Sequence, residues 1–133
     1  MNCIDTDLAI AFLNGDLMAK EQMAGLENEG DIHATSITVF ELTYTKSGMS
    51  PKREIEFQRF LSTLKILPLD KLSALLAGRI KTELLKKGEM LHPEDLFIGS
   101  ICLYNDMTLV THNIKHFNKI NGLKLTDWKP NEG

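Results

Sequence analysis

The sequence predicts an α/β fold in which helices cover both faces of a mainly parallel sheet. Short apolar segments alternate with longer segments of helical periodicity, an order typical of parallel strands joined by helices. Acidic side chains also recur where a strand or loop passes into a helix, and in open α/β sheets such transitions meet at one edge. The 133 residues (15.0 kDa) are most economically one domain spanning residues 1–133.

The first predicted strand and the first two helices lie before residue 30. Residues 2–5 form a short strand, and the Thr6 hydroxyl caps an apolar helix over 8–13 that ends at Asn14-Gly15. A second helix is predicted over 16–28, because its apolar residues fall within reach of one face. These residues are Leu17, Met18, Met23 and Leu26.

The middle of the chain alternates strand and helix twice. A strand over 32–35 leads into a helix over 36–46, which ends before the breakers Ser47-Gly48 and Ser50-Pro51. An amphipathic helix over 52–64 and a strand over 65–67 follow. The apolar positions of this amphipathic helix are Ile55, Phe57, Phe60, Leu61 and Leu64.

The last part of the chain gives the remaining helices and two more strands. Asp70 caps a helix over 71–87 that Gly88 closes. Pro93 occupies the first position of the next helix, which extends to 105–106 and carries small residues at Gly99 and Ser100 that allow close approach to a sheet. A strand over 108–111, a short helix over 114–118 and a fifth strand over 123–126 complete the prediction.

The net charge of −3 is unevenly distributed. Residues 1–31 hold seven acids against Lys20 alone, so this segment carries −6 and the other 102 residues carry +3. The basic residues of the longer part could meet a phosphate backbone, or they could lie on solvated helix faces. They gather in three groups: Lys52-Arg53; Arg79, Lys81, Lys86 and Lys87; and Lys115, Lys119, Lys124 and Lys129.

Cysteine usage and hydropathy favour a cytoplasmic location. Cys3 and Cys102 lack the spacing of a disulfide framework, which suits a reducing compartment. The N-terminus has no basic region, and Asp5 and Asp7 interrupt its apolar residues, so a signal peptide is not expected. No apolar stretch reaches 18 residues, so no membrane contact is expected.

The candidate site consists of Asp5, Glu41 and Asp95, with Asn113 as an amide at a fourth transition. If these transitions meet, three ionised carboxylates in a partly desolvated pocket repel one another, which raises their pKa values unless a cation neutralises them. Oxygen ligands favour Mg²⁺ or Mn²⁺ over zinc. An ion of this kind suits phosphodiester hydrolysis, which is the leading reaction class.

Each acid also has a structural explanation that needs no ligand. Asp5 can cap the following helix together with Thr6. Thr38 and Glu41 fit the capping-box pattern S/T-x-x-E. Asp95 lies in the first turn of a helix, where the macrodipole favours a negative charge.

A second metal-ligand candidate is weaker than the acids. His112 and His116 could place two imidazoles on one helix face, although solvent-facing histidines explain the spacing more simply.

Several short motifs, taken in their order and spacing, resemble the PIN domain family and, within it, the VapC-like toxins of type II toxin–antitoxin pairs. The resemblance covers essentially the whole chain. Its motifs are Ile4-Asp5-Thr6-Asp7, residues 36–42 (SITVFEL), residues 95–100 (DLFIGS), Leu109-Val110-Thr111-His112-Asn113 with His116-Phe117, and residues 120–128 (INGLKLTDW).

The resemblance implies a three-layer α/β/α fold and a Mg²⁺- or Mn²⁺-dependent endoribonuclease. Carried over by position, Asp5, Glu41 and Asp95 resemble the acidic metal ligands, and Thr111 resembles the hydroxyl beside them. Asn113 stands where many members have a fourth acid. Since an amide brings no negative charge, this departure favours one tightly held ion, or a second ion held mainly by substrate phosphate.

The resemblance also implies partners: an RNA substrate, a cognate antitoxin whose C-terminal segment covers the acidic groove, and a second copy in a homodimer. Apolar residues on the early helices could serve such contacts or pack in the core; they are Phe12, Met18, Phe40 and Tyr44. A non-catalytic PIN-like module that binds RNA or protein is the alternative function, suggested by Asn113 and the net acidity. A phospho-acceptor receiver-like domain is disfavoured, because no suitable lysine follows the strand over 108–111.

Overall fold

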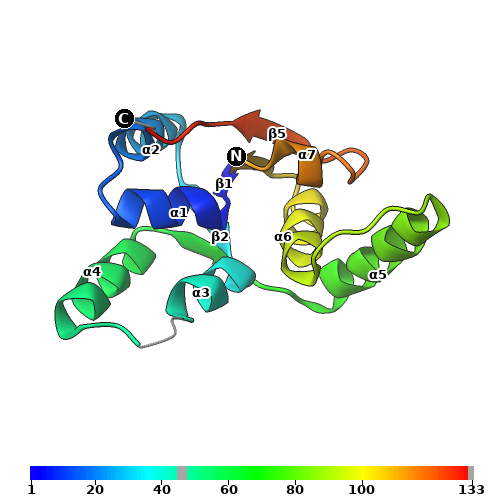
Figure 1. Cartoon of the computed structure of the whole chain (residues 1–133), viewed down its shortest axis with the longest axis horizontal. Helices are drawn as coiled ribbons and strands as arrows, with labels where there is room; N and C mark the ends of the chain where they lie inside the picture. Colours follow the sequence, from blue (N-terminus) through cyan, green and yellow to red (C-terminus); the bar gives the residue numbers. More distant parts are fainter. Residues whose placement is uncertain (45–47, 132–133) are drawn as a thin grey trace.

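A parallel five-stranded sheet forms the centre of the computed structural model, which describes residues 1–44 and 48–131 (Figure 1). The strand order is β3-β2-β1-β4-β5, and every neighbouring pair is parallel. The strands are β1 (Asn2–Ile4), β2 (Ile32–Thr35), β3 (Lys65–Leu67), β4 (Thr108–Thr111) and β5 (Lys124–Asp127). The predicted mainly parallel sheet is therefore confirmed.

The side of the sheet to which successive strands are added changes at β1. It builds β2 and β3 on one side of β1 and then returns to place β4 and β5 on the other side. In register, Asn2 pairs with both Ile32 and Thr108, so β1, β2 and β4 end at the same edge. The crevice between β1 and β4, where the strand order reverses, is the usual ligand site of such sheets.

Helices cover both faces of the sheet and make the predicted three-layer arrangement. In Figure 1, α1, α2 and α4 lie at one end of the molecule, and α5, α6 and α7 lie at the other. The helices are α1 (Thr6–Leu13), α2 (Leu17–Glu29), α3 (Ser36–Thr43), α4 (Pro51–Ser62), α5 (Lys71–Lys86), α6 (Pro93–Tyr104) and α7 (Ile114–Phe117). None of the helices in the described ranges is long and apolar enough to cross a membrane.

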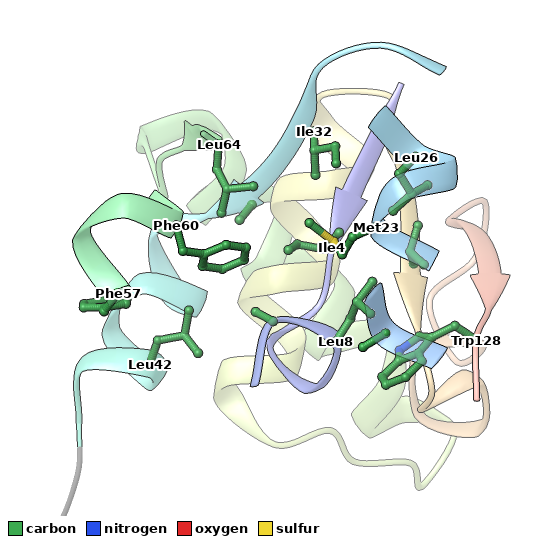
Figure 2. Packing of buried hydrophobic residues seen from close by; sticks show 14 residues of the cluster. Ile4, Leu8, Met23, Leu26, Ile32, Leu42, Phe57, Phe60, Leu64 and Trp128 are labelled. Atoms are coloured by element: carbon green, nitrogen blue, oxygen red, sulfur yellow. The ribbon is translucent and has the colours of Figure 1, made fainter. Parts of the chain in front are cut away.

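Alternate residues of the strands point to opposite faces of the sheet and pack in two separate apolar cores. Ile4 and Val110 pack with residues of α1, α2 and α4, and Figure 2 shows Phe60, Leu8 and Met23 of this cluster near Ile4. The neighbouring strand residues Cys3 and Leu109 instead pack with Ile98 and Cys102 of α6 and Phe117 of α7. This alternation follows from the two-residue period of a strand.

Helix boundaries differ from the prediction at two places that matter for the site. The helix predicted over 36–46 ends at Thr43, because Tyr44 adopts an extended conformation with φ −73° and ψ 114°; residues 45 and 46 lie outside the described residues. The first strand ends at Ile4, and Asp5 rather than Thr6 is the N-cap of α1. The other boundaries shift by one or two residues, as helix ends commonly do.

Gly99 permits a close approach within the second core, although the contact is with the turn after α7 rather than with the sheet. A Cβ atom at this position would lie 2.4 Å from Ile120 Cδ1 and 3.5 Å from Leu123 and Phe117. Ile120 is buried among these side chains and has little room to move.

We therefore expect Gly99→Ala to lower the free energy of unfolding by about 1–2 kcal/mol, since overpacking outweighs the better helix propensity of alanine. Urea denaturation measures this change. Gly78→Ala is the matched control, because Gly78 is also in the middle of a helix and, apart from its chain neighbours and the backbone of its own helix, no described atom lies within 4 Å of such a Cβ. It should stabilise by about 0.5–1 kcal/mol. A stabilised Gly99→Ala would show that the Ile120 side chain yields.

Candidate active site

Asp5 is the most deeply buried acid of the chain among the described residues, with 3% of its surface exposed. Its Oδ1 accepts a hydrogen bond from the Thr6 backbone N–H (2.8 Å), so the capping role considered for Asp5 is real. Its Oδ2 accepts from the Thr111 hydroxyl (2.7 Å) at the end of β4. Burial, followed by repulsion from Asp7, raises the pKa of Asp5 to about 7 despite these two hydrogen bonds.

Glu41 points from α3 toward the start of α1. Its Oε1 accepts a hydrogen bond from the Thr6 hydroxyl (2.7 Å). The capping-box interpretation of Glu41 is wrong, because the N-cap of α3 is Thr35, whose side chain accepts from the Thr38 N–H (3.2 Å). Thr38 is thus the third residue of the helix, and Glu41 lies too far along it to reach the cap. Partial burial raises the pKa of Glu41, with further repulsion from Asp95 and Glu94.

Asp95 lies half-buried in the first turn of α6, which Pro93 opens as predicted. Burial is the main cause that raises the pKa of Asp95, and Glu94 and Asp7 add repulsion. His116 and His92 oppose this shift. The His116 Nδ1 is 3.8 Å from Asp95 Oδ2.

The three predicted acids therefore lie within electrostatic reach of one another. Repulsion from Asp95 contributes to the raised pKa of both Asp5 and Glu41, so Asp95 interacts electrostatically with each of the other two acids. Asp7 and Glu94, which were not among the predicted ligands, extend the same negative region. The signal for both is their place in the sequence: Asp7 is next but one to Asp5, and Glu94 is adjacent to Asp95.

The donor set suits a hard divalent cation that keeps some of its waters. Within residues 1–44 and 48–131, no three His, Cys, Asp or Glu side chains are already arranged as a metal cage. Mg²⁺ is commonly bound through one or two carboxylates and several waters, so it does not need such a cage. Carboxylates with raised pKa values gain from a neighbouring positive charge, which would remove the repulsion among them.

Thr111 links the fourth predicted position to the acids. Its hydroxyl is fully buried, donates to Asp5 and accepts from the Asn113 backbone N–H (3.0 Å). Asn113 is the N-cap residue of α7, but its side chain makes no capping hydrogen bond with the described residues and is exposed. Its amide is therefore left open toward solvent at the edge that carries Asp5.

Asp7 fixes the segment that follows β4. Its Oδ2 accepts from the His112 backbone N–H (2.9 Å), and its Oδ1 accepts from Trp128 Nε1 (3.2 Å). His112 precedes α7 and its Nδ1 lies 3.1 Å from the Trp128 carbonyl oxygen. The idea that His112 and His116 share one helix face is thus wrong, because α7 begins only at Ile114.

The early apolar residues divide between core and surface. Phe12 packs against Phe60 with ring centroids 5.3 Å apart. Met18 (44% exposed), Phe40 (58%) and Tyr44 (70%) are exposed, and the last two rings stack at 6.4 Å. A hollow of about 500 Å³ between α1, α3 and α4 includes Glu41, Tyr44 and Arg53 in its lining. An acid of the site thus borders an open, partly aromatic surface.

Comparison with known proteins gives consistent matches along most of the chain. Residues 3–123 match the family model of the PIN domain. A protein of Rickettsia felis named "Ribonuclease VapC2" is 34% identical over 105 residues, which cover 77% of this chain and 78% of that protein. A Salmonella typhimurium protein named "tRNA(fMet)-specific endonuclease VapC" is 32% identical over 96 residues, covering 71% and 73%.

A solved structure extends this likeness to three dimensions. The crystal structure of VapBC2 from Rickettsia felis bound to a DNA fragment from their promoter superposes with a TM-score of 0.86 at 28% identity. The superposition covers 96% of this chain and 98% of the matched chain.

Proposed function

The chain belongs to the PIN domain family, and we propose that it is an endoribonuclease toxin of the VapC type that hydrolyses RNA phosphodiester bonds. The observation that carries the proposal is the convergence of Asp5, Glu41 and Asp95 from separate elements, each with a raised pKa. Relatives named as ribonucleases and an endonuclease support the reaction class. An RNA substrate also supports a cytoplasmic location.

The proposed cofactor is Mg²⁺ or Mn²⁺, held by Asp5, Glu41 and Asp95. When bound, the ion would supply an activated water and neutralise negative charge during in-line displacement at phosphorus. Thr111 holds the Asp5 carboxylate in one orientation through its hydroxyl. Asp7 holds the backbone after Thr111, which fixes the position of Asn113.

Asn113 sets the charge of the proposed site. The amide can accept a hydrogen bond or coordinate weakly through its oxygen, but it adds no negative charge. Three carboxylates then favour one tightly held ion, with any second ion held mainly by the phosphate of the substrate. The exposed side chain of Asn113 is free to meet that phosphate through its N–H donors.

The proposed protein partner is an antitoxin. The matched structure from Rickettsia felis is described as VapBC2, a complex bound to promoter DNA. The hollow beside Glu41, with the exposed Phe40 and Tyr44 rings near it, offers an antitoxin segment apolar contacts and a place for a cationic side chain near the acids. We also propose a homodimer, as the family resemblance implies.

The proposal predicts metal-dependent RNA cleavage by the purified protein. Initiator tRNA is the first substrate to test, because a relative is named for it, together with other structured RNAs. We expect cleavage with Mg²⁺ or Mn²⁺, loss of cleavage to background with excess EDTA, and recovery when the ion is restored. Cleavage that resists EDTA would contradict the proposed chemistry. RNA binding without turnover under any divalent ion would instead support the non-catalytic binding module.

A further inference from the structure

A line of buried threonine hydroxyls leads through the protein to Glu41. Thr6, Thr35 and Thr38 are 8%, 0% and 0% exposed. The Thr6 and Thr38 hydroxyl oxygens are 3.0 Å apart, and Thr6 donates to Glu41 Oε1 at 2.7 Å. Thr35 donates to the Thr38 hydroxyl at 3.5 Å, which is long for such a bond and makes this the weakest link.

The direction of these hydrogen bonds is fixed by the number of protons. A hydroxyl has one proton to donate, and an ionised carboxylate can only accept, so the Thr6 proton lies on the side of Glu41. The contact between Thr6 and Thr38 can then form only if Thr38 donates to Thr6. The hydroxyl dipoles of Thr38 and Thr6 are therefore aligned, and both point toward the carboxylate.

This alignment connects the buried Thr38 hydroxyl to Glu41 of the candidate site. Without it, the Thr6 hydroxyl oxygen loses the hydrogen bond that it accepts, and with it the polarisation that strengthens and aligns its own bond to Glu41. Thr38 is fully buried, so its hydroxyl needs a hydrogen-bond partner. A buried polar group without a partner would lower the stability of the fold, whereas valine in its place would need none. Within the described residues, the contacts of this hydroxyl are those with Thr6 and Thr35.

We propose that Thr38 is a positioning residue, which orients the Glu41 carboxylate through the Thr6 hydroxyl although it lies outside the acid cluster itself. The proposal rests on the proposed function, because the orientation of Glu41 matters for cleavage only if this acid serves the reaction. Thr6 then has two tasks at once: its backbone N–H binds Asp5 (2.8 Å) and its hydroxyl binds Glu41 (2.7 Å). One residue thereby ties together two of the three acids.

Kinetics of conservative variants test the proposal. We expect Thr38→Val to lower kcat for RNA cleavage about three- to tenfold, the effect of one lost hydrogen bond, with little change in KM. Thr38→Ser, which keeps the hydroxyl, should recover most of the loss. Thr43→Val is the matched control on α3: its exposed hydroxyl donates to the Val39 carbonyl oxygen (2.6 Å) and has no link to Glu41. A Thr38→Val enzyme with unchanged kcat, or a Thr38→Ser enzyme as slow as Thr38→Val, would overturn the proposal.

A second measurement separates this proposal from the proposed function. Urea unfolding of Thr38→Val, Glu41→Gln and the double variant measures the coupling between the two positions without RNA or metal. We expect the changes in the free energy of unfolding to be non-additive. We expect this non-additivity to disappear when all variants of the cycle also carry Thr6→Val, because the connecting hydroxyl is gone. If the wild-type protein cleaves no RNA, the proposed function fails while this coupling still decides the role of Thr38. Additive changes in the free energy of unfolding would refute the link from Thr38 through Thr6 to Glu41, even in an active enzyme.

Discussion

Replacement of Asp5 by asparagine should lower kcat for RNA cleavage by about 10³-fold, the loss expected when a charged group that stabilises the reacting centre is removed. The amide has nearly the volume of the carboxylate and its oxygen can still accept from the Thr6 N–H. It cannot bring a negative charge to a metal ion. The asparagine amide would also turn an N–H donor toward the Thr111 hydroxyl. In the wild-type protein this hydroxyl donates to the Asp5 carboxylate.

The comparison needs a variant that makes the same chemical change elsewhere. Asp31→Asn serves, because Asp31 is exposed and pairs with Lys65 (2.9 Å) before β2, at the opposite end of that strand from the acids. Its kcat should stay within about twofold of wild type, since exposed ion pairs contribute little. Initial rates with labelled RNA at saturating Mg²⁺ measure both variants. An Asp5→Asn enzyme that retains a tenth of the wild-type rate would remove Asp5 from the proposed metal ligands.

Without a divalent ion, the protein should lose stability as pH rises from about 4 to about 7. An unperturbed aspartate has a pKa of 3.8, whereas the pKa of Asp5 in the folded protein is about 7. The folded state therefore binds more protons than the unfolded state in this interval, and the free energy of unfolding falls with pH. At 1.36 kcal/mol per pKa unit, the full change is on the order of 4 kcal/mol and is complete above pH 7. The pKa values of Glu41 and Asp95 shift in the same direction.

Urea denaturation of wild type and Asp5→Asn across this pH range isolates the contribution of Asp5. Exposed acids with lowered pKa values, such as Asp31 and Asp106, act in the opposite direction in both proteins and cancel in the difference. At pH 8, Mg²⁺ at about 100 times its Kd should stabilise wild type by about 2.7 kcal/mol and Asp5→Asn by much less. Parallel stability curves for the two proteins would show that Asp5 does not titrate as its burial implies.

The sequence was informative about where the acids lie because strand order and helix starts are encoded locally. Short apolar segments followed by capping residues placed Asp5 and Asp95 at strand or helix boundaries, and the structure agrees. The parallel sheet then brings such boundaries to one edge, whatever the details of packing. The assignment of metal ligands among these acids stays a prediction.

The partners of Glu41 could not be predicted in the same way. The pattern S/T-x-x-E fits Thr38 and Glu41, yet the helix starts at Ser36 with Thr35 as its cap. Local sequence offers several threonines that could cap, and only the contact between α1 and α3 decides that Glu41 turns to Thr6. The same holds for Asp7, whose bonds to His112 and Trp128 join residues more than 100 positions apart.

The pairing of β1 with the late strand β4 bears on when the acid site can form during protein synthesis. β1 is the central strand, but its neighbour β4 follows more than a hundred residues later, and the Asp5–Thr111 hydrogen bond spans 106 positions. Asp95 and Thr111 leave the ribosome long after Asp5, and contacts of such long range form slowly. A growing chain therefore has its first acid without the partners that orient it. If Asp5 serves RNA cleavage as proposed, a nascent chain would gain activity only after β4 has joined the sheet.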